Sequence, residues 1–451
     1  MPTIIAIESK TVTEAGVRSP YEHLYLVKRT TDDLGNVIDE RVIRGGFNNG
    51  GDLVAQANVS LASSNDARGS DSLAERHHRV LNLAGRDPDA VWNLMVQHAA
   101  NINKADLQYS VDIFDALPGA DLNSNTVVAS AMHTVGINVA TNLPRGVSVR
   151  DVPLYDQIGD MRVNDVLIGG DQPDRIYGGV GNDRIDGGDG NDRLYGEAGS
   201  DALVGRGGND VLNGGAGTDR MNGGLGSDTY YVDSGDKVID TAVDDGLDHI
   251  VSTTNVYLSR TGYSGVENIT LRGSADLTGY GNALANVIIG NSFDNRLSGG
   301  GGDDRLVGNR GNDDLIGGSG ADRLSGGSGK DELYGGSGRD VLSGGTGSDT
   351  FDFRSTSHSV ADTALSDVIV DFSRLDVIDL HVIDANANRG LNQSFSFIGK
   401  AAFSGAGQLR YDLDQSGNTI VQADVNGDLT ADFQLILQGY TQAMLRGDFI
   451  L

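Results

Sequence analysis

The sequence predicts a mainly β protein built around a parallel solenoid, in which short strands coil into stacked turns. Three observations predict this fold class. An Asp or Asn recurs every nine residues through two long stretches, an apolar residue follows each of them two places later, and glycine supplies 65 of the 451 residues against only 7 prolines. A fixed short period indicates stacked units, because each unit covers its apolar side only with its neighbours.

The repeat falls into two blocks, from Asp165 to Asp228 and from Asn286 to Asp349. If one turn and one short strand take nine residues, two repeats complete a coil of eighteen. Each apolar residue then points inward from its strand and contributes to a thin core. These inward residues are Leu167, Ile176, Ile185, Leu194, Leu203, Leu212, Met221 and Tyr230 in the first block, and Ile288, Leu297, Leu306, Leu315, Leu324, Leu333, Leu342 and Phe351 in the second.

The chain outside the two blocks differs in composition. Glycine thins out before residue 160, and the segment from Val91 to Val96 has a helical pattern of apolar residues. Strand-like alternation after residue 353 predicts a cover for the last coil, because the ends of a solenoid must be closed. The predicted domains are a separate α+β N-terminal domain at 1–160, a first solenoid block at 161–233, an irregular linking coil at 234–284, a second block at 285–353 and a C-terminal β cap at 354–451.

The chain is strongly acidic, with 63 Asp and Glu residues against 34 Lys and Arg and a net charge of −29. Nucleic acids and anionic membranes would repel it, so we expect neither as a partner. The absence of cysteine excludes disulfides, thiolate catalysis and cysteine-ligated zinc. The N-terminus lacks the basic region of a Sec signal peptide, and no stretch reaches the roughly 20 apolar residues that span a bilayer.

The positions of the acidic residues in the repeat predict that they bind calcium. Calcium binds about six to eight oxygen atoms, and a glycine-rich turn directs main-chain carbonyls to one point because glycine adopts positive φ and has no Cβ in the way. Turns on the same edge are eighteen residues apart, so one ion fits between stacked turns with an aspartate from each. The predicted ligands are Asp174, Asp183, Asp192, Asp201, Asp210, Asp219, Asp228, Asp304, Asp313, Asp322, Asp331, Asp340 and Asp349.

Glycines of the best-preserved turns are predicted to take part in the same sites. They are Gly179, Gly181, Gly188, Gly190, Gly215, Gly217, Gly318, Gly320, Gly327, Gly329, Gly336 and Gly338. Pairing the aspartates gives about five calcium ions in the first block and about four in the second, which begins with Asn286 and Asn295. Without ions the carboxylates repel one another over a thin core, so we expect the blocks to fold only as calcium binds.

Parts of the chain resemble a known family. The units Gly178-Gly179-Val180-Gly181-Asn182-Asp183 and Gly317-Gly318-Ser319-Gly320-Ala321-Asp322 resemble the calcium-binding repeats of the RTX (repeats-in-toxin) family. Residues 285–451 are similar to the C-terminal domain of the serralysin metalloproteases. The segments that carry this similarity are Gly347-Ser348-Asp349-Thr350-Phe351-Asp352-Phe353, Asp376-Val377-Ile378-Asp379-Leu380 and Phe395-Ser396-Phe397-Ile398-Gly399.

The resemblance implies an extracellular protein of a Gram-negative bacterium, exported in one step by type I secretion machinery through an uncleaved C-terminal signal. The last residues, Asp448-Phe449-Ile450-Leu451, are similar to the end of that family in having an acidic residue before three apolar ones. Export of an unfolded chain, followed by folding outside at higher calcium concentration, also fits the absence of cysteine. Besides calcium, an extracellular polysaccharide or a cell surface is then the expected partner.

The sequence lacks the catalytic motifs of related enzymes. None of the eight histidines begins the HExxH motif that a zinc protease carries on a helix. No GxSxG motif occurs either, which argues against the RTX lipases. We therefore expect a non-catalytic calcium-binding protein.

One alternative, a secreted peptidase or esterase, rests on the N-terminal domain. His23 leads an apolar strand, and Ser124 lies within Asn123-Ser124-Asn125, just before a predicted short helix at Val127–Thr134. The pair resembles permuted papain-fold peptidases of the PPPDE type, which implies His23 as the base and Ser124 in place of the family's cysteine. Serine forms its anion far less readily than cysteine, and the competing interpretation is an ordinary strand residue and a helix cap.

Overall fold

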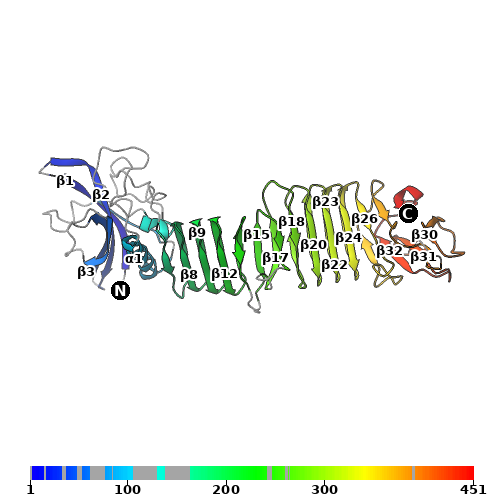
Figure 1. The fold of residues 1–451 in the computed structure, drawn as a ribbon, viewed down its shortest axis with the longest axis horizontal. Coiled ribbons are helices and arrows are strands. Elements are labelled where there is room, and N and C mark those ends of the chain that lie inside the picture. Colours follow the sequence, from blue (N-terminus) through cyan, green and yellow to red (C-terminus); the bar gives the residue numbers. More distant parts are fainter. Residues whose placement is uncertain are drawn as a thin grey trace. The chain divides into compact units, whose positions relative to one another are not determined.

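The protein is mainly β in a computed structural model (Figure 1). The structure describes residues 3–14, 17–32, 37–47, 53–60, 77–83, 85–104, 130–137, 163–240, 246–259, 263, 265–388 and 392–451. The chain divides into two compact units, Met1–Gly246 and Leu247–Leu451.

The first unit begins with an antiparallel sheet whose strand order is β4-β3-β2-β1-β5. The strands are β1 (Thr3–Glu14), β2 (Val17–Thr31), β3 (Val37–Phe47), β4 (Leu53–Ser60) and β5 (His77–Val80). Leu26 of β2 pairs with Ile43 of β3, and both side chains are fully buried. Apolar cross-strand pairs of this kind hold neighbouring strands in register.

The helix α1 (Pro88–Lys104) lies against this sheet, in contact with β4 and β1. Asp87 begins it by accepting a main-chain N–H at 3.1 Å, and Pro88 suits the first helical position because its missing N–H has no partner there. Val91 and Met95, one helical turn apart, are both fully buried. The predicted helix around Val91 is therefore confirmed.

A parallel solenoid of two sheets follows in the first unit. In one sheet the strand order is β14-β12-β10-β8-β6. In the other sheet the strands of this unit follow the order β13-β11-β9-β7. The strands are β6 (Val166–Ile168), β7 (Arg175–Val180), β8 (Arg184–Asp189), β9 (Arg193–Gly199), β10 (Ala202–Gly207), β11 (Val211–Gly217), β12 (Arg220–Leu225), β13 (Thr229–Val232) and β14 (Lys237–Val238). Ile185, Leu203 and Met221 pair directly across β8, β10 and β12, so one coil takes eighteen residues, as predicted.

The second unit contains a solenoid of the same kind. Its two sheets run in the orders β15-β17-β19-β21-β23-β25-β27 and β16-β18-β20-β22-β24-β26-β28. The strands are β15 (Asp248–Ser252), β16 (Val256–Tyr257), β17 (Val266–Leu271), β18 (Thr278–Tyr280), β19 (Val287–Ile289), β20 (Arg296–Gly301), β21 (Arg305–Arg310), β22 (Asp314–Ser319), β23 (Arg323–Gly329), β24 (Glu332–Ser337), β25 (Val341–Gly347), β26 (Thr350–Asp352), β27 (Asp367–Ile369) and β28 (Val377–Asp379). The predicted parallel solenoid is thus confirmed in both blocks.

The core of each solenoid consists of the inward apolar residues that the period predicted. All sixteen of them, from Leu167 to Tyr230 and from Ile288 to Phe351, are no more than 2% exposed. Each such side chain contributes roughly 1.5–3 kcal/mol by leaving water. With one apolar residue per strand and glycine turns between, this core is thin, and the turns must supply further stability.

The C-terminal part covers the last coil of the second unit with a small sheet, in which β30, β31 and β32 are antiparallel and β29 pairs with β30 in parallel. Its strands are β29 (Ser396–Phe397), β30 (Gln408–Leu413), β31 (Thr419–Asp424) and β32 (Phe433–Leu437), after which a 3-10 turn (Arg446–Asp448) and β33 (Phe449–Ile450) end the chain. β32 pairs with β27 and β33 pairs with β28, so both sheets of the solenoid are continued. Within the described residues, no helix is long and apolar enough to cross a membrane.

Candidate metal centre

The repeat aspartates form a ladder of hydrogen bonds along both edges of each solenoid, which we call the carboxylate ladder. The Oδ1 atom of each member accepts the main-chain N–H of the member eighteen residues earlier, at 2.7–3.0 Å. The acceptors are Asp183, Asp192, Asp201, Asp210, Asp219 and Asp228 in the first block, and Asp304, Asp313, Asp322, Asp331, Asp340 and Asp349 in the second. These bonds fix the orientation of every carboxylate.

The second oxygen of these carboxylates, Oδ2, is buried, and we call it the inner oxygen. No donor in the described part of the chain reaches the inner oxygen of Asp183, Asp192, Asp201, Asp210, Asp219, Asp304, Asp313, Asp322, Asp331, Asp340 or Asp349. A buried acceptor without a partner costs about 1–3 kcal/mol, and more when it is charged. A row of them, all at one position of the repeat, indicates a bound cation as the partner.

The first glycine of each turn places a carbonyl oxygen beside an inner oxygen. An ideal Cβ on Gly178 would overlap with the Oδ2 atom of Asp183 and lie 2.8 Å from the carbonyl oxygen of Gly196, one coil further on. Carboxylate and carbonyl oxygens therefore converge on a space that only glycine leaves open. Hard oxygen donors of this kind suit calcium.

Sequence reasoning missed this first glycine, although the signal was present. Glycine stands five residues before every repeat Asp or Asn from Asp174 to Asp228 and from Asn286 to Asp349, without exception. The next position is less strict, since Glu197, Arg206 and Asn309 replace glycine there.

The glycines predicted from the sequence have a different role in the turn. Gly179, Gly181, Gly188, Gly190, Gly215, Gly217, Gly318, Gly320, Gly327, Gly329, Gly336 and Gly338 all have φ between +92° and +156°. Most of them also abut the main chain of the preceding coil, so a Cβ at Gly318, for example, would collide with the carbonyl of Gly300. Their contribution as ligands stays a prediction.

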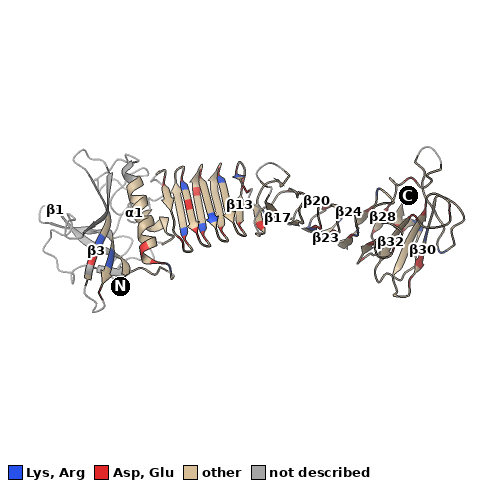
Figure 2. Ribbon diagram, turned by 90° about the horizontal axis from the view of Figure 1, so that it is seen from below, with Lys and Arg blue, Asp and Glu red and all other residues tan. Residues whose placement is uncertain are grey.

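The donor set explains why no group of three acidic or histidine side chains gathers within the described residues. Each candidate site has two ladder carboxylates, and main-chain carbonyls such as that of Gly196 lie beside them. Arginines such as Arg184, Arg193 and Arg220 follow the ladder aspartates directly in the sequence and are exposed. Figure 2 marks basic positions in blue on the strands of the first solenoid.

Burial makes the ladder carboxylates difficult to ionise without a cation. Burial, reinforced by neighbouring carboxylates, raises the pKa of Asp183 and Asp192 to about 7, against an ordinary value of 3.8. The same causes raise the pKa of Asp304 and Asp313 to about 7, and burial raises the pKa of Asp210 to about 6. A bound cation would offset this cost, because it favours the charged form.

At the first positions of each block, the atom that corresponds to the inner oxygen accepts a hydrogen bond from the protein. The Oδ2 atom of Asp174 accepts the N–H of Gly170 at 2.9 Å. In the second block the amide oxygen of Asn286 accepts an N–H at 2.8 Å, and its amide nitrogen donates to the carbonyl of Glu267 at 2.9 Å. Hydrogen bonds within the protein thus satisfy these positions.

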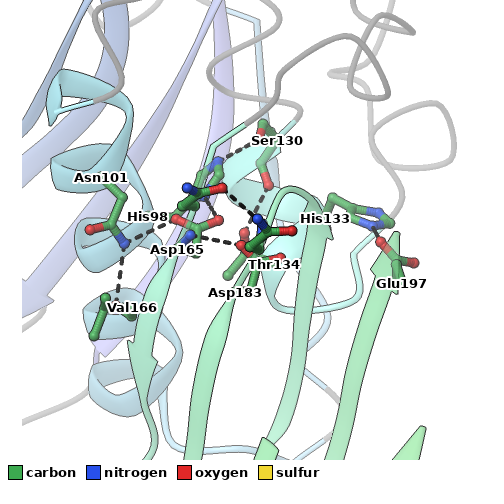
Figure 3. Close-up of polar contacts among 11 residues, drawn as sticks. His98, Asn101, Ser130, His133, Thr134, Asp165, Val166, Asp183 and Glu197 are labelled. Carbon is green, nitrogen blue, oxygen red and sulfur yellow. Dashed lines mark hydrogen bonds and ion pairs between the residues drawn. The ribbon is translucent and has the colours of Figure 1, made fainter. Parts of the chain in front are cut away.

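A buried polar network lies at the N-terminal end of the first solenoid (Figure 3). The Nδ1 atom of His98 in α1 lies 2.7 Å from the Oδ2 atom of Asp165, and Asn101 donates to the Oδ1 atom of Asp165 at 2.9 Å. The Nε2 atom of His98 contacts the Oγ atom of Ser130. His98, Ser130 and Asp165 are 3%, 4% and 1% exposed, so this buried row of Ser, His and Asp joins α1 to the first coil.

A second contact joins the segment 130–137 to the solenoid through a residue that breaks the repeat. The Nε2 atom of His133 lies 2.5 Å from the Oε2 atom of Glu197, which replaces a turn glycine (Figure 3). The other replacement in this block, Arg206, donates twice to the Asp186 carboxylate, at 2.5 and 2.6 Å. Both residues keep the positive φ of the glycine they replace, 75° and 83°.

The structure does not describe the side chains of the predicted hydrolase pair. His23 lies in β2, opposite Lys10 of β1, but its side chain is outside the described residues, as is Ser124. Of the predicted helix at Val127–Thr134, residues 130–134 are helical and the earlier ones are likewise outside the described residues. The His23 and Ser124 site therefore stays a prediction.

Comparisons with known proteins agree with the geometry of the turns. A profile of the RTX calcium-binding nonapeptide repeat matches residues 163–194, 195–230, 280–315 and 316–351. No curated protein matches the chain as a whole sequence.

Solved structures that are similar to parts of the chain include two epimerase subunits and a lipase. The R3 and R2 subunits of AlgE6, a mannuronan C5-epimerase of Azotobacter vinelandii, are 24% and 25% identical, with TM-scores of 0.23 and 0.25. These alignments cover 40% and 39% of this chain and 80% and 92% of those subunits. The extracellular lipase LipA of Serratia marcescens is 21% identical with a TM-score of 0.19, over 63% of this chain and 39% of the lipase.

The turn geometry and the profile match lead to one conclusion. The matched residues contain the glycines and aspartates of the described turns, which recur with a period of nine residues. The two blocks of this chain are RTX calcium-binding nonapeptide repeats folded as a parallel β-solenoid.

Proposed function

We propose that this chain is a secreted calcium-binding protein whose solenoid folds as calcium binds outside the cell. The observation that carries the proposal is the row of inner oxygens, buried and without a donor among the described residues. Repeats of this type imply calcium binding, and the carboxylate and carbonyl oxygens beside the first glycine fit that ion.

Each ion would lie between consecutive ladder members on one edge. In the pair Asp183 and Asp201, the N–H of Asp183 holds one carboxylate oxygen of Asp201 at 2.7 Å, which leaves both inner oxygens for the ion. The carbonyl of Gly196 lies in the same space. Such pairs support about five ions in the first block and about four in the second, and the Asp174 and Asp192 pair is the weakest because Asp174 already has a partner.

Calcium binding would supply the folding free energy that the core lacks. Without an ion, the fold buries carboxylates that burial alone makes costly to ionise. The unfolded chain has no preformed site, so ion binding and folding occur together. This coupling keeps the chain unfolded wherever calcium is scarce.

Type I export through the C-terminus is the second part of the proposal. The last residues are folded into the cap: Phe449 is buried in β33, and Arg374 donates to the buried Asp448 carboxylate at 3.1 Å. A secretion signal in this segment is accessible only before the chain folds, which fits export in the calcium-poor cytosol. Deletion of residues 448–451 is expected to retain the protein in cells that carry a type I exporter, and export of the shortened chain would contradict this route.

The calcium proposal is tested by circular dichroism of the full chain. Purified protein in millimolar calcium should show the β signal of the solenoid, EGTA should remove most of it, and added calcium should restore it. Magnesium at the same concentration should not, because it requires near-ideal octahedral coordination. A β signal that EGTA leaves unchanged would contradict the proposal.

A further inference from the structure

The carboxylate ladder of the second unit continues past the last repeat. After Asp340 the spacing changes from eighteen residues to twenty-seven, and Asp367 is the next member. The N–H of Asp340 donates to the Oδ1 atom of Asp367 at 2.8 Å, and the N–H of Val368 donates to the carbonyl of Asp340 at 2.9 Å. Asp322 has the same two contacts in the repeat. Its N–H donates to the Oδ1 atom of Asp340 at 2.8 Å, and its carbonyl accepts the N–H of Val341 at 2.9 Å.

Asp367 also has a free inner oxygen, although no repeat motif precedes it. Its side chain is 0% exposed, and within the described chain no donor reaches its Oδ2 atom. The inner oxygen of Asp340, the preceding ladder member, is likewise buried and without a donor there. Two consecutive members thus leave the same pair of oxygens that characterises the repeat sites.

On the opposite edge, the last ladder aspartate has a hydrogen bond to each of its two carboxylate oxygens. Asp376 is also twenty-seven residues after its partner, and its Oδ1 atom accepts the N–H of Asp349 at 3.0 Å. Its Oδ2 atom, however, accepts the N–H of Ser373 at 2.7 Å. In the first unit Asp236 ends an edge in the same way, with its two oxygens bonded by Asp219 and Asp233. Asp367 differs from both.

The C-terminal cap explains how Asp367 is held. The Oγ atom of Ser359 accepts the N–H of Asp367 at 2.8 Å and donates to the carbonyl of Gln434 in β32. β27, which Asp367 begins, pairs in parallel with β32, so Asp367 stands opposite Leu435. The nine extra residues therefore bring Ser359 and the cap over the turn and exclude water from it.

We propose that Asp340 and Asp367 hold one further calcium ion, beyond the last repeat, between the solenoid and its cap. The inference rests on the proposed function, because it assumes that the inner oxygens of the ladder face calcium. Main-chain carbonyls complete the donor set, as in the repeat turns. The ion would link the cap to the last repeat coil and raise the number expected in the second unit to about five.

The experiment counts calcium ions bound to the purified full chain, by elemental analysis after equilibrium dialysis, in wild type, Asp367→Asn and Asp376→Asn. Asparagine is tolerated at ladder positions, since Asn286 and Asn295 occupy two of them. We expect Asp367→Asn to bind one ion fewer than wild type and Asp376→Asn to bind the same number. An unchanged count in Asp367→Asn, or an equal loss in both variants, would overturn the inference.

A measurement on the unmodified protein covers the case in which Asp367→Asn fails to fold. Crystals of wild type grown with calcium should give an anomalous difference peak between the carboxylates of Asp340 and Asp367. Absence of that peak, with peaks present in the repeat turns, would overturn this inference and leave the proposed function intact. A wild-type chain that binds no calcium at all would instead overturn the proposed function.

Discussion

At each ladder aspartate the two carboxylate oxygens have different neighbours. Oδ1 is held by a main-chain N–H of the neighbouring coil, and Oδ2 lies beside the first glycine of the turn. The first contact is a structural bond that any folded coil can make. The second places a negative oxygen in a buried space, where only a cation can offset its cost.

At the residue scale, Gly178→Ala is expected to disable one calcium site. The added methyl would occupy the space shared by the Asp183 carboxylate and the Gly196 carbonyl. We expect one bound ion fewer, together with a loss of roughly 1–3 kcal/mol in folding free energy from overpacking. Calcium titration followed by calorimetry measures the first, and denaturant unfolding in saturating calcium measures the second.

Gly170→Ala provides the matched control. Gly170 also lies in a turn of the first block, but an ideal Cβ there has no neighbour within 4 Å and its φ is not in the left-handed region. This variant should bind calcium like wild type. Equal ion counts in Gly178→Ala and Gly170→Ala would show that the first glycine does not shape the site.

The ladder aspartates and the buried apolar residues could be read directly from the sequence, because a strict period of nine fixes which side of the coil each residue faces. The bonding of individual oxygens could not. Asp174 and Asp183 have the same place in the motif, yet only Asp174 has its Oδ2 atom bonded by a glycine N–H four residues earlier. The motif alone does not distinguish these two positions, because the bond depends on how the turn is folded.

Among the elements, α1 closes the first coil through polar side chains. His98 and Asn101 of this helix take both oxygens of Asp165, the position where a ladder carboxylate of an interior coil would face an ion. The sequence offered no signal for this contact, since His98 and Asp165 are sixty-seven residues apart and match no motif. It arises from how the helix lies on the coil.

His98→Ala is expected to weaken this junction. Loss of a hydrogen bond to a buried charged group costs roughly 1.5–3 kcal/mol, so the free energy of unfolding of the N-terminal part should fall by that amount in saturating calcium. Trp92, the one tryptophan of the chain and a buried residue of α1, reports this transition by fluorescence. His381→Ala is the control, because the His381 side chain is 57% exposed. An unfolding midpoint of His98→Ala equal to that of the control would contradict this role.

The irregular repeat units have a structural explanation at the same scale. The sequence shows Glu197 and Arg206 as departures from the glycine pattern. Glu197 contacts His133 of the N-terminal domain, and Arg206 forms a two-bond ion pair with Asp186. A positive φ is unfavourable for a residue other than glycine. These side-chain contacts offset that cost, and both units keep the turn conformation.

For the whole molecule, the net charge of −29 and the buried carboxylates make folding dependent on pH. Burial raises the pKa of ladder carboxylates such as Asp183 and Asp340 to about 7 in the ion-free fold, against 3.8 ordinarily. The ion-free fold therefore binds protons more tightly than the unfolded chain. Its stability is highest below about pH 4 and falls as the pH rises through about 7.

Calcium reverses this dependence, because the ion binds the ionised carboxylates. In calcium-depleted buffer, the β signal by circular dichroism should be larger at pH 5 than at pH 8. The calcium concentration at half-saturation should instead be higher at pH 5 than at pH 8. In calcium-depleted buffer, an equal circular dichroism signal at pH 5 and pH 8 would mean that the buried carboxylates do not oppose folding.

The carboxylate ladder has a direction along the chain. In every rung the amide belongs to the earlier coil and the carboxylate to the later one, from Asp165 onward. The main-chain N–H of one coil therefore orients the carboxylate of the next coil. Disruption of one coil would therefore first release the carboxylates of the coil on its C-terminal side. The stack has a direction in this respect, although its strands and turns repeat almost identically.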